Sequence, residues 1–209
     1  MTAFRTRTLT LATVALFTAA TAAFAADTNF DSGRWRLEQG TAEPSYAATE
    51  PLSSTVNLDA VVLACESADT GSRPRHLLQL QLYTTDGGPL RPRRLGAEQS
   101  RQLTDEPQAR LAIDGQAYPV TLMFGDSYVV VVDSQVDGFA ALSRRLQAAL
   151  QAGHKLTLGF DLVANQADEA VVDLRSAGAQ AAIRTMRQCA ETPVAPRRPR
   201  RGAALPATN

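Results

Sequence analysis

Hydrophobic and polar residues alternate along much of the chain, which is the pattern of half-buried β-strands. The clearest alternation lies between His76 and Tyr83, where Leu78, Leu80 and Leu82 occupy every second position and glutamines fill the gaps. This spacing puts the leucines on one face of a strand and the glutamines on the other. Together with the apolar run Val61–Cys65, the segment predicts a long hairpin.

Further strands are expected where short apolar runs lie between turn residues. The hairpin around Asp114-Gly115 is the strongest signal, because both turn residues tolerate positive φ. The β-branched run 128–132 is expected to be a central strand, buried on both faces. The expected strands are Arg34–Glu38, Arg110–Ile113, Gln116–Phe124, Tyr128–Val132, His154–Val163 and Glu169–Leu174. The stretches 41–54 and 86–108 contain prolines or several arginines and are expected to be loops.

Two segments show helical spacing of apolar residues. The first runs from Gly138 to Ala152, with Asp137 as its expected cap and Gly153 as its end. The second runs from Ala177 to Cys189, with Ser176 as its expected cap. Cys189 falls on the apolar face of this helix and is expected to point at the core.

These elements predict a single α+β domain over residues 34–191. We expect a mainly antiparallel sheet of about seven strands, covered by two helices and joined by one disulfide. Trp35, the only tryptophan, is expected to anchor the core.

The N-terminus predicts export. Arg5 and Arg7 precede an apolar stretch, and Ala23-Phe24-Ala25 offers small residues at the positions that a signal peptidase recognises. We therefore expect a signal peptide over 1–25, a disordered linker over 26–33, and a mature protein in a bacterial periplasm. A Pro- and Arg-rich disordered tail is expected over 192–209.

The two cysteines fit an oxidising compartment, where a disulfide between Cys65 and Cys189 is expected. The alternative is two separate buried thiols. Two cysteines alone make no metal site, and neither His76 nor His154 stands at a ligand spacing from them. No metal and no cofactor is predicted.

Basic and acidic residues are equal in number, 21 of each, but unevenly placed. Two arginines lie in the leader and four in the tail, so acidic residues outnumber basic ones in the body, and nucleic acid is not expected as a partner. The expected contacts to an envelope protein are arginines of one loop and the tail, and the tail is also a candidate for weak contact with anionic membrane or cell-wall polymer. These residues are Arg91, Arg93, Arg94, Arg101, Arg197, Arg198, Arg200 and Arg201.

No local motif for a nucleophile, a catalytic metal or a phosphate is present. Acid pairs such as Asp126 with Asp133 leave a carboxylate-based hydrolase open. The segment 133–138 resembles a calcium loop only superficially, because Gln135 and Arg144 stand where acidic ligands are needed.

The C-terminal third resembles periplasmic accessory proteins associated with type VI secretion. The likeness rests on the strand Val171–Leu174, on Ser176, and on the small-residue helix that closes on Cys189. The order of the preceding helix and strand is also similar. A looser likeness, in signal peptide, cysteines and a mainly β body, is to the invasion-associated locus B family. The turn at Ala177-Gly178 and the first half of the chain depart from the pattern, and no functional residue carries over.

The sequence thus favours a non-catalytic exported binding or accessory protein of the bacterial cell envelope. Its role would be secretion support or inhibition of an envelope-targeting enzyme. Two alternatives stay open. One is a carboxylate-based envelope hydrolase, and the other is a small-ligand-binding protein with a pocket between the first helix and the sheet.

Overall fold

The structure is a computed structural model that describes residues 33–68, 75–96, 102–125, 127–164 and 166–192. The expected signal peptide, almost all of the expected linker and the tail beyond Thr192 lie outside these ranges. Asp126 and Arg101 do so as well. Among the described helices, none is long and apolar enough to cross a membrane.

The described residues form strands and two α-helices, with one short 3₁₀ turn, η1, at Thr85–Gly87. The helices are α1 (Arg144–Ala152) and α2 (Ala179–Glu191). The strands are β1 (Arg36–Leu37), β2 (Tyr46–Thr49), β3 (Ser53–Ser54), β4 (Leu58–Ala68), β5 (Arg75–Thr84), β6 (Leu103–Ile113), β7 (Gln116–Tyr118), β8 (Thr121–Phe124), β9 (Tyr128–Val132), β10 (Ser134–Val136), β11 (Phe139–Ala141), β12 (Lys155–Val163) and β13 (Gln166–Asp173).

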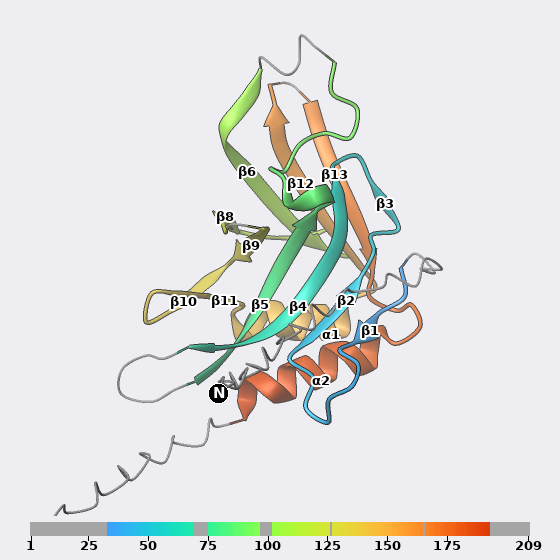
Figure 1. The fold of residues 1–209 in the computed structure, drawn as a ribbon, viewed down its shortest axis with the longest axis vertical. Coiled ribbons are helices and arrows are strands. Elements are labelled where there is room, and N and C mark those ends of the chain that lie inside the picture. Colours follow the sequence, from blue (N-terminus) through green and yellow to red (C-terminus); the bar gives the residue numbers. More distant parts are fainter. Residues whose placement is uncertain (1–32, 69–74, 97–101, 126, 165, 193–209) are drawn as a thin grey trace, which may run out of the picture.

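The strands build two antiparallel sheets and a small ribbon (Figure 1). One sheet has six strands in the order β1-β2-β4-β5-β9-β8, and the other has five in the order β3-β13-β12-β6-β7. Strands β10 and β11 pair only with each other. The mainly antiparallel α+β fold with two helices and one disulfide is therefore confirmed.

The hairpin of β4 and β5 forms the centre of the six-stranded sheet, with Leu63 opposite Leu80. This confirms the hairpin that the alternating leucines predicted. The leucines face the main core and are almost fully buried. On the opposite face the glutamines form side-chain hydrogen bonds, with Gln79 donating to the Ala140 carbonyl and Gln81 to Glu66.

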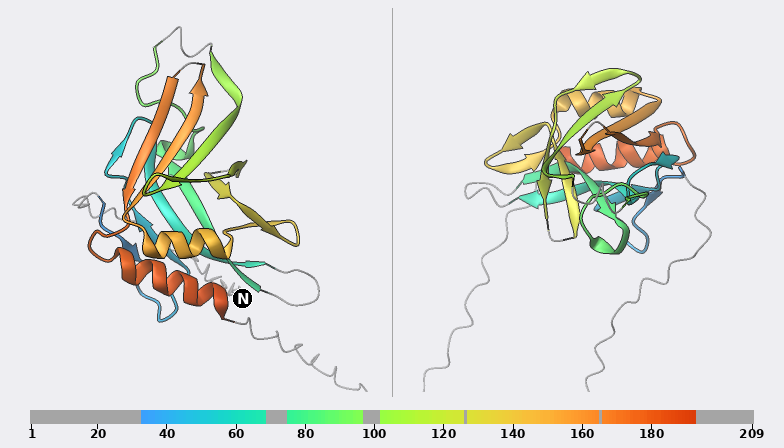
Figure 2. Two further views of the ribbon diagram at one scale, coloured as in Figure 1. Left: turned by 180° about the vertical axis from the view of Figure 1, so that it is seen from behind. Right: turned by 90° about the horizontal axis from the view of Figure 1, so that it is seen from above.

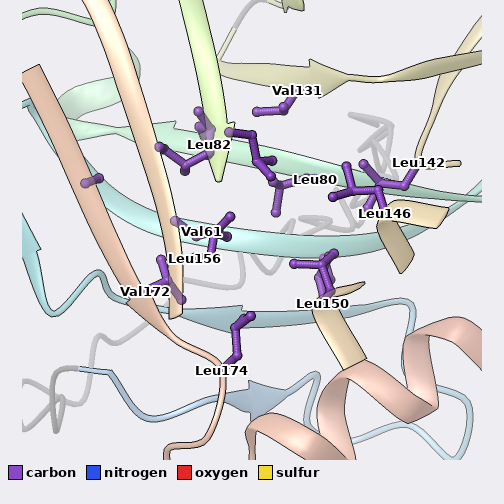
Figure 3. Packing of buried hydrophobic residues seen from close by; sticks show 14 of the residues in the cluster. Val61, Leu80, Leu82, Val131, Leu142, Leu146, Leu150, Leu156, Val172 and Leu174 are labelled. Atoms are coloured by element: carbon purple, nitrogen blue, oxygen red, sulfur yellow. The ribbon is translucent and has the colours of Figure 1, made fainter. Parts of the chain in front are cut away.

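The core fills the space between the two sheets and the helices (Figure 3). The labelled side chains come from β4, β5 and β9 of one sheet, from β12 and β13 of the other, from α1, and from Leu142 and Leu174, which lie just before α1 and just after β13. Labelled examples are Val61, Leu80, Leu82, Val131, Leu142, Leu146, Leu150, Leu156, Val172 and Leu174. The close packing of these branched side chains, each removed from water, is the main source of stability.

The two helices lie side by side at one end of the molecule (Figure 2). Helix α2 buries Ala182, Ile183 and Met186 and contacts β4 and β5. The disulfide between Cys65 of β4 and Cys189 of α2 then fixes the end of this helix to the sheet. Trp35 is buried, and its indole N–H donates to the Asp173 carbonyl at 3.0 Å, so its expected role as a core anchor is confirmed.

The first helix is shorter than predicted. It begins at Arg144 and is capped by Ser143, whose Oγ accepts from Leu146 N at 3.2 Å. The predicted cap, Asp137, instead forms a tight turn with Gly138, and both have positive φ (51° and 85°). This turn joins β10 to β11, so the first residues of the predicted helix form a hairpin. The predicted end at Gly153 is correct.

The second helix also starts later than predicted, at Ala179. Gly178 precedes it with φ of 84°, and a Cβ at this position would lie 2.5 Å from the Trp35 carbonyl oxygen. Only glycine fits this approach. Ser176 is not the cap, because its hydroxyl donates to the Gly33 carbonyl. Gly33, expected in the disordered linker, is buried at this point.

Both predicted loops contain strands. The loop expected over 86–108 ends with the first six residues of β6, in which Gln108 pairs with Asp161 and Leu103 with Val163. The loop expected over 41–54 contains β2 and β3, and β2 pairs with the apolar half of β4. Both segments lack strict alternation, so the neighbouring strand determines their conformation.

The strand expected over 116–124 is divided between the sheets. Residues 116–118 form β7 beside β6, and after Pro119-Val120 the chain continues as β8 beside β9. Strand β9, expected to be central, is buried as predicted over Val129–Val132 but stands next to the edge strand β8. The β10–β11 ribbon covers its second face, where Ala140 packs against Val130.

Candidate functional site

The disulfide lies at the edge of a pocket of about 370 Å³ that β4, β5, the loop before β2 and α2 enclose. Cys65 is 6% exposed, whereas Cys189 is half-buried. His76 of β5 lines the same pocket. The two sulfurs and one ring nitrogen of His76 all lie within 4.8 Å of one another. His76 has no ligand spacing to either cysteine in the sequence, yet the fold brings its ring to both sulfurs.

The sheet register explains how His76 reaches the cysteines. His76 is in phase with the leucines of β5 and shares their face of the strand. Its partner across the sheet is Ser67, two residues beyond Cys65 on β4, and Ser67 Oγ lies 3.3 Å from His76 Nδ1. The alternation in the sequence already indicated the face on which His76 lies, because a residue two positions before Leu78 belongs to the leucine face.

Three of the predicted arginine contacts lie among the described residues. Arg91, Arg93 and Arg94 are all exposed. Arg93 serves the fold, because its Nε donates to the Val56 carbonyl at 2.7 Å and its Nη2 to the Leu58 carbonyl at 2.9 Å. Arg101 and the four tail arginines (Arg197, Arg198, Arg200 and Arg201) lie outside the described residues.

One of the two acids in the pair that the hydrolase hypothesis named has a structural role in the described fold. Asp133 accepts hydrogen bonds from the Ser143 backbone N–H at 2.8 Å and from the Ser143 hydroxyl, so it holds the start of α1. Asp126 lies outside the described residues. A different carboxylate, Asp168, is 2% exposed and accepts from Thr55 Oγ1 at 3.0 Å and Gln166 Nε2 at 3.1 Å. These bonds tie the segment after β3 to β13, which is a structural role.

The ligand pocket expected between the first helix and the sheet is filled by the helix itself. Leu146 and Leu150 of α1 are fully buried in the main core. The described hollows instead open at the surface. A polar hollow of about 530 Å³ lies beside Arg93, and one of about 470 Å³ lies beside Asp168.

Strand β8 is an edge strand of the six-stranded sheet, and β6 of the other sheet lies near it. Strand β8 carries two large apolar side chains in water: Met123 is 42% exposed and Phe124 is 56% exposed. Its sequence, Thr-Leu-Met-Phe, contains no charge. Natural edge strands are usually protected by charges, prolines or bulges. The periodicity predicted this strand, but sheet order, which exposes its edge, is not visible in one sequence.

No protein-family model, curated protein or solved structure matches the chain.

Proposed function

We propose that the protein is a non-catalytic exported binding or accessory protein of the bacterial cell envelope, and that it binds an envelope protein through the open edge of β8. The observation that supports this function is the exposure of Met123 and Phe124 on an uncharged edge strand. The N-terminal leader pattern and the disulfide agree with a periplasmic location. We expect its role to be secretion support, which the likeness to secretion-associated accessory proteins implies, or inhibition of an envelope-targeting enzyme.

The backbone of β8 offers hydrogen-bonding groups to a partner. Gly125 N donates to the Tyr128 carbonyl at 2.9 Å. In an antiparallel pair the bonded residues alternate along the strand, so Met123 is bonded to β9 while Leu122 and Phe124 direct their N–H and C=O groups away from β9. An extended segment can pair with these groups as an additional strand.

Other edges in the described fold are less suited to this role. Strands β1 and β3 have two residues each, and the edge strand β7 has three. The part of β6 that extends beyond β7 contains Glu106 and Pro107, which discourage pairing. Strand β8 has four residues, with apolar side chains on both of its faces. The partner is therefore expected to supply an extended segment with apolar side chains.

The test is a pull-down of the mature protein from periplasmic and membrane extract under non-reducing conditions, followed by mass spectrometry. Phe124→Lys places a charge on the edge and is expected to reduce recovery of a specific partner about tenfold or more. Leu52→Lys is the matched control, because Leu52 is similarly exposed (52%) but lies outside β8. Equal recovery by the wild type and both variants would refute the β8 contact. The absence of any specific partner would refute the binding function.

A further inference from the structure

We propose that the pocket around Cys65, Cys189 and His76 becomes a binding site for a thiophilic metal ion, Zn²⁺, when the disulfide is reduced. The inference goes beyond the envelope-binding function and does not depend on it. Two thiolates and an imidazole are a common ligand set for Zn²⁺, with an open fourth position for solvent. Neither cysteine can supply a thiolate while the two sulfurs are bonded to each other.

The ligand atoms are already close to the required separation. A tetrahedral zinc ion with bonds of about 2.3 Å to sulfur and 2.0 Å to nitrogen holds its ligand atoms roughly 3.5 to 3.8 Å apart. All three atoms lie within 4.8 Å of one another. They come from three elements, β4, β5 and α2, that the core holds together. Small side-chain rotations would therefore suffice once the sulfurs can separate.

The surroundings also fit a metal site. Ser67 Oγ lies 3.3 Å from Nδ1 of His76, and such a contact orients a histidine ring. The pocket of about 370 Å³ gives an ion and its solvent ligand access to the sulfurs. Glu43 is one of the lining residues and adds negative charge to the pocket.

The redox step balances with a dithiol as reductant. The dithiol supplies two electrons and two protons to the sulfur–sulfur bond, which breaks to give the thiols of Cys65 and Cys189, and the reductant becomes a disulfide. Binding of Zn²⁺ then releases the two thiol protons, because thiolates are the metal ligands. The disulfide and the bound metal ion are thus alternative cross-links between β4 and α2.

The test is a titration of the reduced, desalted full-length mature protein with Co²⁺ and then Zn²⁺ under anaerobic conditions. We expect one equivalent of Co²⁺ with thiolate-to-cobalt charge-transfer absorption, which Zn²⁺ displaces, and no such band from the oxidised protein. His76→Ala is expected to weaken binding at least about tenfold, and Ser67→Ala about tenfold. His154→Ala is the control, because His154 lies at the Asp114 turn and contacts neither cysteine. No stoichiometric band, or equal affinity in the His76 variant, would overturn the proposal.

A second measurement covers the case in which the reduced chain loses its fold. Binding to the native state raises the melting temperature. Zn²⁺ is therefore expected to raise the melting temperature of the reduced wild type, and to do so much less for the reduced His76→Ala variant. If Zn²⁺ does not change the melting temperature of the reduced protein, the proposed site is contradicted.

Discussion

Removing the disulfide should cost several kcal/mol of stability, and the size of the loss follows from the loop that it closes. Cys65 and Cys189 are separated by 124 positions. In the chain-entropy model a loop of this length restricts the unfolded chain by about 16 cal/mol/K, or roughly 5 kcal/mol at 25 °C. The double variant Cys65→Ser with Cys189→Ser removes this restriction. For a domain of this size, the melting temperature should fall by roughly 10 to 20 °C.

The assay is urea unfolding of the mature wild type and the double variant under identical conditions. Circular dichroism of both proteins before unfolding checks that the variant is folded. A loss of free energy of unfolding well below about 2 kcal/mol would refute the entropic reasoning. It would mean that the apolar face of α2 already holds this helix to the sheet in compact unfolded states.

Two further changes probe how turns and caps hold the elements together. Ser143→Ala removes the cap of α1 and the partner of Asp133, so the free energy of unfolding should fall by about 1 kcal/mol. Ser143→Thr keeps the hydroxyl and should lose less free energy of unfolding. Equal losses for the two variants in urea unfolding would contradict the role of Ser143 as a cap. Backbone N–H donors of Lys155 and His154 hold the pKa of Asp114 below its ordinary value of 3.8. The ionised carboxylate thus stabilises the fold above pH 3.8, and this contribution is lost as the pH falls through the lower folded pKa. In Asp114→Asn the free energy of unfolding should therefore fall less steeply as the pH is lowered. An unchanged slope of this free energy against pH would count against the role of Asp114.

The sequence predicted those elements whose local pattern and neighbours agree. The leucine and glutamine alternation of β5 and the Asp114-Gly115 turn specify their structures almost unaided. The prediction from the sequence was wrong where two local patterns competed. Residues 138–152 have helical spacing throughout, but Asp137-Gly138 also favours a hairpin turn, and the ribbon formed because Ala140 could cover β9.

The candidate sites depended on tertiary structure and were harder to predict. The disulfide was predicted because two cysteines in a chain expected to be exported leave one pairing. His76 was missed because its approach to the sulfurs requires the register of β4 with β5 and the docking of α2. The open edge of β8 follows from sheet order, which depends on the crossing between the sheets at Pro119.

The most direct test of the binding function is photo-crosslinking from the edge of β8 in living cells. A photoreactive residue is placed at position 123 in one variant and at the similarly exposed position 52 in another, and adducts are identified by mass spectrometry. We expect one dominant envelope-protein adduct from position 123 and little from position 52. Adducts of equal intensity from both positions, or none from position 123, would contradict it.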